Sequence, residues 1–221
     1  MSTSQTALPS SIVVPVDHEL VVKKSRFLAH LEPVGSVEQA EAVIARVRKQ
    51  RWDARHHCVA LVVGPQAGQQ RSSDDGEPAG TAGVPMLEVL RHRDLTDLVA
   101  VVTRYFGGVL LGAGGLVRAY SGAVAGALDR ARLVRREILT EVTMDASPAE
   151  AGRLDNWLRE WAASHGGVWT EPVWTATARF RLLVPPAALG TLADEVAAFS
   201  AGALVPVTGE SRVVDIPDGP A

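Results

Sequence analysis

The sequence predicts an α+β protein of two domains, on the basis of its length, its alternating elements and its charge distribution. The chain has 221 residues, which at about 150 residues per domain suits one large domain or two small ones. Predicted strands and helices alternate along both halves, but the halves differ in charge. Residues 1–134 carry 15 Lys and Arg against 13 Asp and Glu, whereas residues 135–221 carry 7 against 12. We therefore assign 1–134 to a first domain, 135–210 to a second and 211–221 to a flexible tail.

The first half is predicted from apolar runs and helix-start signals. Strands are expected at 12–16, 27–33, 57–63 and 98–105, and helices after Ser36, at 84–92 and at 116–133. Ser36 and Gln39 have the spacing of a capping box, and apolar residues follow them at helical period. Residues 64–83 are predicted to form one long loop, and loops of that length inside a domain are usually functional or mobile.

The second half has the element order βαββαβ. Residues 137–144 alternate as a half-buried strand should, and Ser147, Pro148 and Glu150 form a strong helix start that Gly166 ends. Two strands at 168–174 and 176–184, a helix from Pro185 and a strand at 204–208 complete the order. This order is the split βαβ, or ferredoxin-like, pattern.

Composition excludes several classes of protein. No apolar run reaches about 18 residues, so a membrane span is excluded. The first residues lack the basic and apolar stretches of a secretory signal. Cys58 is the single cysteine, which permits no internal disulfide and makes a reducing cytoplasm the expected location. A net charge of −3 excludes a strongly basic, histone-like binder of nucleic acid.

Three segments of the first half have compositions too specific for a generic core. They are WDARHHC at 52–58, DDGEPAGTAG at 74–83 and RYFGGVLLGAGGLVRAY at 104–120. In this order, over roughly residues 18–130, they resemble the IMPACT family, and specifically its bacterial, YigZ-type members. The third segment is the most diagnostic. The second half is similar to the small C-terminal domain of those bacterial members, which is related in fold to the last domains of elongation factor G.

The resemblance implies a fold and a class of partner. The first domain is expected to have the fold of the second domain of ribosomal protein S5. Eukaryotic relatives regulate translation by competing for a partner of a translation-initiation kinase, and bacterial members are associated with nucleic acid or the ribosome. The expected partners are therefore RNA, DNA, the ribosome or a translation-related protein, with no membrane. The oligomeric state stays open.

The glycine-rich segment from Gly107 to Gly115 lies between a predicted strand and a predicted helix. Backbone N–H groups at a helix N-terminus attract anions, and Arg104 and Arg118 flank the segment. The spacing is neither that of a P-loop nor that of the dinucleotide fingerprint. The residues thus indicate either an anion or phosphate site, or a tight turn in which glycine serves close packing.

The acidic segment Asp74, Asp75 and Glu77 allows three interpretations. The carboxylates have the oxygen ligands that Mg²⁺ prefers. They can instead pair with Arg104, Arg118 or Arg55 and fix the loop over the site. Asp-Gly and Glu-Pro pairs are also common in plain solvated turns.

The segment from Arg55 to Cys58 also has several interpretations. Alternate strand residues share a face, so His56 and Cys58 would face together as a nucleophile pair. A zinc site would need His30 or His92 to converge. We favour a third interpretation, in which one histidine is a polar contact at the edge of a cleft, the other histidine packs, and the cysteine packs in the buried run.

These observations favour a binding module over an enzyme. Tyr105, Phe106 and Tyr120 can either stack on bases or pack in the core, and Lys23 and Lys24 add local positive charge. No catalytic residue, metal or cofactor is assigned. The candidate anion- or nucleic-acid-binding residues are Arg55, His56, Arg104, Tyr105, Gly107, Gly108, Gly114, Gly115 and Arg118, with Asp74, Asp75 and Glu77 as loop carboxylates. The alternative is an enzyme that binds a small molecule or phosphate between residues 74–77 and 107–115.

Overall fold

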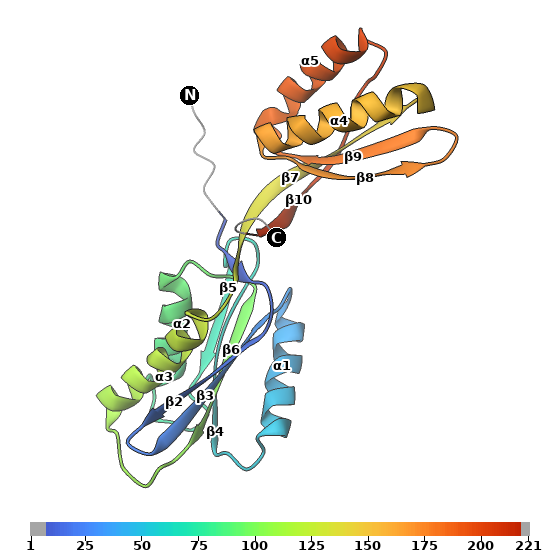
Figure 1. Ribbon diagram of the computed structural model, residues 1–221. Helices are drawn as coiled ribbons and strands as arrows, with labels where there is room; N and C mark the ends of the chain where they lie inside the picture. The colour runs from blue at the N-terminus through green and yellow to red at the C-terminus, as the bar shows by residue number, and fades with distance from the viewer. Residues whose placement is uncertain (1–7, 218–221) are drawn as a thin grey trace, which may run out of the picture. The chain divides into compact units, whose positions relative to one another are not determined.

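The structure is a computed structural model that describes residues 8–217. The chain divides into two compact units, the first formed by Met1–Arg136 with Ile216–Ala221 and the second by Glu137–Asp215. Each unit is a sheet covered by helices (Figure 1). The division falls within one long strand, whereas the sequence-based boundary was placed at 134/135.

The first unit is built on a five-stranded antiparallel sheet with the order β2-β3-β6-β4-β5. Its strands are β2 (Val16–Val22), β3 (Ser25–Pro33), β4 (His56–Val63), β5 (Gln69–Ser73) and β6 (Leu98–Tyr105), and its helices are α1 (Val37–Gln50), α2 (Gly83–His92) and α3 (Ala113–Leu128). A short β1 (Ser11–Ile12) pairs with the start of β7 (Leu133–Ala146).

Helices cover both faces of this sheet, and each face has its own core. One core joins the sheet to α2 and α3 and contains Phe27, Leu31 and Tyr120. The other lies under α1 and contains Ile44, Leu61 and others. Figure 1 shows α1 on one side of the sheet and α2 with α3 on the other. The central strands β4 and β6 are therefore buried on both faces, which explains their nearly continuous apolar sequences.

The second unit has the predicted element order βαββαβ. It contains β7, α4 (Pro148–His165), β8 (Val168–Trp174), β9 (Ala178–Val184), a 3₁₀ turn at Pro186–Ala188, α5 (Leu189–Ser200) and β10 (Val207–Pro217). The strands β7, β9 and β8 pair in that order, and β10 also pairs with β7. Apolar residues of α4 and α5, such as Leu154, Leu158 and Leu192, pack with Phe180 of the sheet in one core.

The helix signals at Ser36, Pro148 and Gly166 are confirmed, whereas the Ser147 hydroxyl donates to the Glu150 carboxylate and not to the helix backbone. The Ser36 hydroxyl accepts a hydrogen bond from the Gln39 N–H, and Gln39 Oε1 accepts one from the Gly35 N–H. Helix α4 begins at Pro148 and ends at His165, and its C-cap Gly166 has a φ of 68°, in the left-handed region. Glycine occupies that region at little cost because it has no Cβ.

Three segment predictions need correction. Residues 211–217 belong to β10 rather than to a flexible tail, because the β-branched residues at 213, 214 and 216 suit a strand; residues 218–221 lie outside the described residues. The loop predicted at 64–83 contains β5, an edge strand so polar that it has no apolar signal. The strand predicted at 12–16 is replaced by β1 and β2, and β2 alternates between half-buried and exposed positions.

Candidate functional site

The acidic loop between β5 and α2 is held in place by its own carboxylates, beginning with Asp74. The Asp74 carboxylate accepts hydrogen bonds from the backbone N–H groups of Gly80, Ala82 and Gly83, at 2.8, 3.0 and 2.8 Å. The N-cap residue of α2, Ala82, has no side-chain acceptor. Asp74 therefore supplies from a distance the capping oxygen that the helix start lacks.

Asp75 ties the same loop to β4 and α1. Its Oδ2 accepts a hydrogen bond from the His57 backbone N–H at 2.7 Å, and its Oδ1 accepts one from Arg48 Nη2 at 2.9 Å. Its carbonyl oxygen accepts a hydrogen bond from His56 Nδ1 at 2.9 Å. The backbone of Asp75 has a φ of 44°, in the left-handed region that aspartate tolerates better than most residues.

Glu77 forms a buried ion pair with Arg104 at the end of β6. Arg104 Nη1 donates to both Glu77 oxygens, at 2.7 and 3.0 Å, and the Tyr120 hydroxyl donates to Oε1 at 2.7 Å. The side chains of Arg104 and Glu77 are only 8% and 3% exposed. The guanidinium also lies over the rings of Phe27 and Phe106, 5.5 and 5.6 Å from their centroids.

This geometry decides between the three interpretations of the acidic loop. Glu77 pairs with Arg104, one of the arginines named from the sequence, whereas Asp75 pairs with Arg48, which the sequence did not indicate. Arg55 and Arg118 form no ion pair with the loop. Within residues 8–217 no three His, Cys, Asp or Glu side chains come together as metal ligands, so the geometry gives the magnesium and zinc interpretations no support.

Cys58 is a core residue and not a nucleophile. It is fully buried, and its thiol donates to the carbonyl oxygen of Asp74 at 2.9 Å. Burial is the main cause that raises the pKa of the Cys58 thiol to about 12, and nearby carboxylates add to it. Since only the thiolate is strongly nucleophilic, Cys58 is inert at neutral pH. Burial likewise lowers the pKa of His57, so this neighbour stays neutral.

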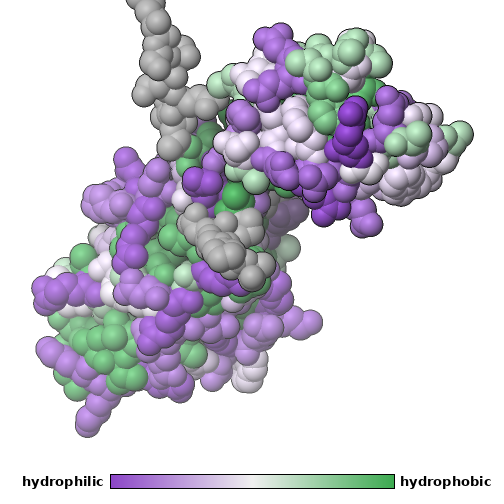
Figure 2. Space-filling model, turned by 45° about the horizontal axis from the view of Figure 1, so that its top comes forward, coloured by the Kyte–Doolittle hydropathy of each residue, from purple (hydrophilic) through white to green (hydrophobic). Residues whose placement is uncertain are grey.

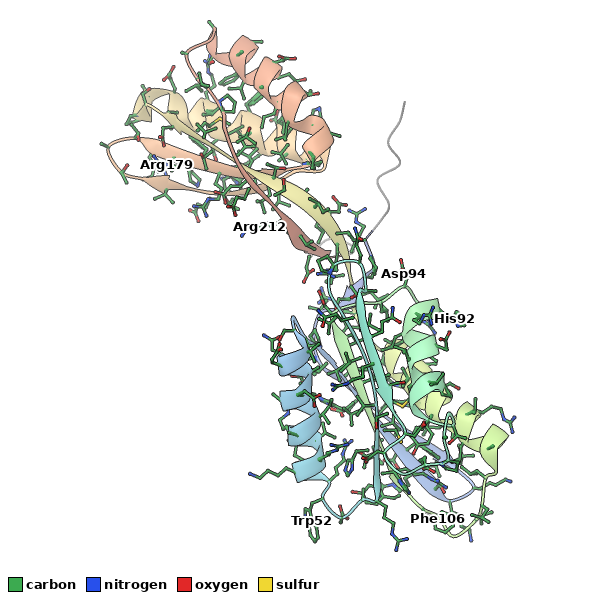
Figure 3. All side chains as sticks on the ribbon, turned by 180° about the vertical axis from the view of Figure 1, so that it is seen from behind. Trp52, His92, Asp94, Phe106, Arg179 and Arg212 are labelled. Carbon is green, nitrogen blue, oxygen red and sulfur yellow. The ribbon has the colours of Figure 1, made fainter. Side chains whose placement is uncertain are left out.

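An open cleft lies at the end of the sheet where β6 stops. It has a volume of about 490 Å³ and is lined by Asp53, Ala54, Arg55, His56, Arg104, Tyr105, Phe106 and Leu110; we call it the Arg55 cleft. Four of the predicted site residues, at 55, 56, 104 and 105, therefore line one cleft. Figure 3 shows Trp52 and Phe106 at this end of the first unit and His92 and Asp94 at the opposite end.

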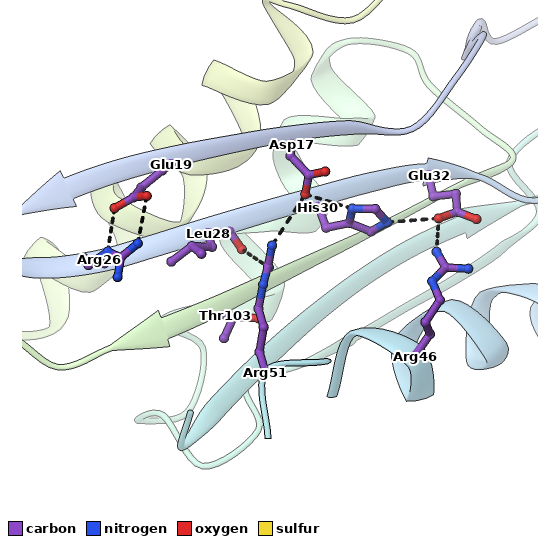
Figure 4. A network of polar contacts seen from close by, with 9 residues as sticks. All are labelled: Asp17, Glu19, Arg26, Leu28, His30, Glu32, Arg46, Arg51 and Thr103. Atoms are coloured by element: carbon purple, nitrogen blue, oxygen red, sulfur yellow. Dashed lines mark hydrogen bonds and ion pairs between the residues drawn. The ribbon is translucent and has the colours of Figure 1, made fainter. Parts of the chain in front are cut away.

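Polar contacts fix the loop 51–55 that forms one wall of the Arg55 cleft. Arg51 Nη1 donates to the Leu28 carbonyl at 3.3 Å and to Thr103 Oγ1 at 3.5 Å, and the Tyr105 hydroxyl donates to Asp53 Oδ1 at 2.9 Å. Figure 4 shows Arg51 within a larger network across β2, β3 and α1. In it, the ring nitrogens of His30 contact the carboxylates of Asp17 and Glu32, at 3.0 and 2.9 Å.

A smaller hollow is also lined by a residue of the loop 106–112. It has a volume of about 150 Å³ and is lined by Val22, Lys23, Leu111, Gly115, Arg118 and Ala119; we call it the Arg118 hollow. Leu110 lines the Arg55 cleft and the next residue, Leu111, lines the Arg118 hollow. Two consecutive residues of one loop thus contribute to the two sites.

The glycines of this loop serve different purposes. A Cβ on Gly107 would overlap the backbone of Lys24 and Ser25, so this glycine is required for close packing. Gly112 caps α3 with a φ of 70°, and no side chain caps that helix start. A Cβ on Gly114 would lie 3.6 Å from Arg118 Nη1, which shows that the guanidinium folds back toward the first turn. The close-packing interpretation therefore holds for Gly107, and the anion-site interpretation of the segment stays a prediction.

The structure adds residues that sequence reasoning left out of the site. Leu110 and Phe106 both line the cleft, and these residues are 82% and 57% exposed. The sequence indicates the Phe106 ring only as a candidate for base stacking or core packing. Asp53 was unassigned because a single aspartate in a loop has no signal of its own. Figure 2 shows apolar surface bordered by hydrophilic side chains on the first unit.

Comparison with known proteins places these features in a family. The family described as "Impact N-terminal domain" matches residues 23–128. The Escherichia coli protein "IMPACT family member YigZ" is 40% identical over 199 residues, which cover 89% of this chain and 94% of that protein. The chain belongs to the IMPACT family. The Bacillus subtilis "IMPACT family member YvyE" is 48% identical over 144 residues, 65% of this chain and 66% of its own length.

More distant members and a solved structure extend the comparison. The rabbit "Protein IMPACT" is 30% identical over 151 residues, which cover 64% of this chain and 42% of the rabbit protein. A solved structure titled "Crystal structure of an hypothetical protein" is 37% identical, covers 93% of this chain and has a TM-score of 0.59. The acidic loop, the Arg55 cleft and the Arg118 hollow lie almost entirely within the IMPACT match. No helix among residues 8–217 is long and apolar enough to cross a membrane.

The Asp74 cap predicts a stability change at acid pH. Burial alone would raise the pKa of Asp74, but the hydrogen bonds from Gly80, Gly83 and Ala82 outweigh it and hold that pKa below its usual range. A lowered pKa stabilises the fold above the unfolded-state value, near 4, and this contribution is lost as pH falls through the folded pKa. Asp74→Ala should cost about 0.5–2 kcal/mol at pH 7.

Denaturation of both proteins between pH 7 and pH 2.5 checks this expectation. The difference in stability between the native chain and Asp74→Ala should narrow steadily below pH 4. A difference that stays constant over the whole range would show that the Asp74 charge does not hold the loop.

Proposed function

We propose that this IMPACT-family protein binds RNA, free or within the ribosome, through the end of its first unit, and acts in translation regulation as a binding module. The observation that carries the proposal is a group of exposed cations beside exposed aromatic and apolar side chains. Lys23, Lys24, Arg55 and Arg118 form no ion pair within the described chain, and Phe106 lies among them. Unpaired cations next to stacking platforms are typical of proteins that bind single-stranded nucleic acid.

Arg55 and Arg118 belong to the minority of arginines in the first unit that form no ion pair with another described residue. Most other arginines already have a carboxylate partner, as Arg26 has Glu19, Arg71 has Glu41 and Arg93 has Asp129. A paired arginine must break its ion pair before it can contact a phosphate. The unpaired cations can bind phosphates without that cost, and binding would release counterions.

The Arg118 hollow supports a phosphate subsite within the same surface. Arg118 folds toward the first turn of α3, that turn holds no acidic residue, and Lys23 also lines the hollow. The N–H groups of a helix start and two cations favour an anion. The Arg55 cleft, which the same loop 106–112 also lines, then receives the neighbouring nucleotide.

A small-molecule or phosphate-binding enzyme is the alternative. The size of the Arg55 cleft favours it, because small-molecule sites commonly measure about 300–1,000 Å³. The loop carboxylates argue against it, since Asp74, Asp75 and Glu77 are all occupied by protein donors. A reaction at this site would need its acid or base from elsewhere.

The proposal also covers the fold relationships of the two units, the partners of the protein and its location in the cell. We infer that the first unit is related to the second domain of ribosomal protein S5 and that the second unit is ferredoxin-like, which its order βαββαβ supports. A translation-related protein is the candidate partner besides RNA, and the expected location is the cytoplasm.

Fluorescence anisotropy with a labelled single-stranded RNA tests the proposal. We expect affinity to fall steeply with salt, and Arg55→Ala or Arg118→Ala to reduce the salt slope by about 1 each. Arg91→Ala is the matched control, because Arg91 lies next to His92 at the opposite end of the unit and pairs with Glu88. Absence of binding to RNA, single-stranded DNA and ribosomes at every salt concentration would refute the proposal.

A further inference from the structure

We propose that the Arg55 cleft accepts one unpaired guanine of the bound RNA, whose Watson–Crick edge donates hydrogen bonds to the Asp53 carboxylate. The inference rests on the proposed function, since it names the base that the RNA places in this cleft. It is carried by the hydrogen-bonding character of the lining residues. The cations of the cleft can contact the phosphates of the RNA, whereas the uncharged base would lie against the Asp53 carboxylate.

The aromatic side chains give the cleft a surface for the plane of a base. Phe106 is 57% exposed at the end of β6, and Leu110 beside it is 82% exposed. The Arg104 guanidinium lies 5.6 Å from the Phe106 ring centroid and is held there by Glu77. One side of the ring is thus supported inside the protein, which leaves the other available for stacking.

Asp53 supplies a partly satisfied acceptor in the wall of the cleft. The Tyr105 hydroxyl donates to Oδ1 at 2.9 Å, and no described residue donates to Oδ2. An ionised carboxylate accepts about four hydrogen bonds and donates none, so Asp53 retains most of its capacity. The bond from Tyr105 also limits the orientations that the carboxylate adopts.

His56 adds a second acceptor. Its Nδ1 contacts the Asp75 carbonyl oxygen at 2.9 Å, and a carbonyl can only accept, so the hydrogen of the neutral ring is on Nδ1. Nε2 is then the acceptor nitrogen of a residue that lines the cleft. Asp53 and His56 thus supply the acceptors in the wall of the cleft, and Arg55 supplies donors for a phosphate; Nη1 of Arg104 is bound to Glu77.

The chemistry of the four bases then selects guanine. Guanine presents N1–H and N2–H side by side, and this parallel pair of donors matches the two oxygens of a carboxylate. Adenine and cytosine present one amino group beside a ring nitrogen acceptor, and uracil presents one N–H between two carbonyls. Each of those three would place an acceptor against Asp53, which is unfavourable because like partial charges meet.

The test compares eight-nucleotide uridine RNAs that differ at one central position. Anisotropy should show binding about tenfold tighter with a central guanine than with adenine or cytosine, as expected for one good bidentate contact. Inosine keeps N1–H but lacks the N2 amino group, so its affinity should lie between those of guanine and adenine. Asp53→Asn should abolish the preference for guanine while binding to the other RNAs persists.

Tyr105→Phe is the matched control, because it removes the hydroxyl that contacts Asp53 and keeps both the ring and the carboxylate. It should retain a preference for guanine. Equal binding of all four RNAs by the native chain would refute the guanine inference and leave RNA binding intact. Failure of every RNA to bind would instead refute the proposed function. An unchanged guanine preference in Asp53→Asn would assign the preference to another residue and overturn the role of Asp53.

Discussion

Replacing Glu77 by alanine should lower the free energy of unfolding of the first unit by about 3–5 kcal/mol. The variant leaves the Arg104 guanidinium buried without its counter-ion, and it removes the acceptor of the Tyr120 hydroxyl. Arg104 Nε already has no hydrogen-bond partner, so the loss of Glu77 would leave still more of the guanidinium without an acceptor. Desolvation of an unpaired charge then opposes folding.

Hydrogen exchange of the β6 and α3 amides is the suitable measurement, because it reports on the first unit without assuming that both units unfold together. Glu41→Ala is the matched control. Its carboxylate pairs with Arg71, and both side chains are about half exposed. Loss of such a surface pair should change stability by about 0–1 kcal/mol.

A double variant separates burial of an unpaired charge from a general loss of packing. Glu77→Leu with Arg104→Met removes both charges and fills much of the space, and it should recover a large part of the stability lost in Glu77→Ala. If the double variant is less stable than Glu77→Ala, the Arg104–Glu77 pair is a net source of stability and the argument from an unpaired charge is wrong.

Gly107→Ala is the second large expected effect, with a loss of about 1–3 kcal/mol. The added Cβ would overlap the backbone of Lys24 and Ser25, and backbone cannot turn aside as a flexible side chain can. The β2–β3 hairpin would have to move, although Lys23 and Lys24 already adopt left-handed φ values of 47° and 67°. The Gly107 N–H, which donates to Ser25 Oγ at 3.1 Å, would move with it.

Gly68→Ala is the control for this prediction. A Cβ on Gly68 meets no atom within 4 Å, so the substitution should be neutral or stabilise the protein by up to about 1 kcal/mol. Thermal denaturation and hydrogen exchange of the hairpin amides measure both variants. Equal stabilities for Gly107→Ala and Gly68→Ala would mean that the hairpin and the loop 106–112 separate easily.

The parts of the fold that depend on residues close together in the sequence could be predicted from it. The caps at Ser36 and Gly166 depend on a few residues each, so their signals are complete within a short segment. The apolar runs of β4 and β6 likewise predicted buried strands. β5 was missed because an edge strand with one row of neighbours needs no apolar residues, and Gln69–Ser73 has none.

The candidate site was predicted less completely because its contacts join distant residues. Composition named Glu77 and Arg104 as potential partners, but Arg48 pairs with Asp75 only because α1 packs across the sheet beside β4. Asp53 and Leu110 line the cleft because the loops that carry them run past it. No periodicity or capping signal specifies such paths, which follow from how the ends of β6 and α1 are placed.

The Arg104–Glu77–Tyr120 contacts have a consequence for how this family can diverge. Glu77 lies 27 positions before Arg104 and 43 positions before Tyr120 in the chain. Its buried carboxylate is balanced by the Arg104 charge and accepts a hydrogen bond from the Tyr120 hydroxyl. Replacing either Glu77 or Arg104 alone leaves the charge of the other residue buried without a counter-ion. Selection should therefore replace these two positions together or retain both, so that relatives carry either the complete buried ion pair or neither of its charges, even where the surrounding loops differ.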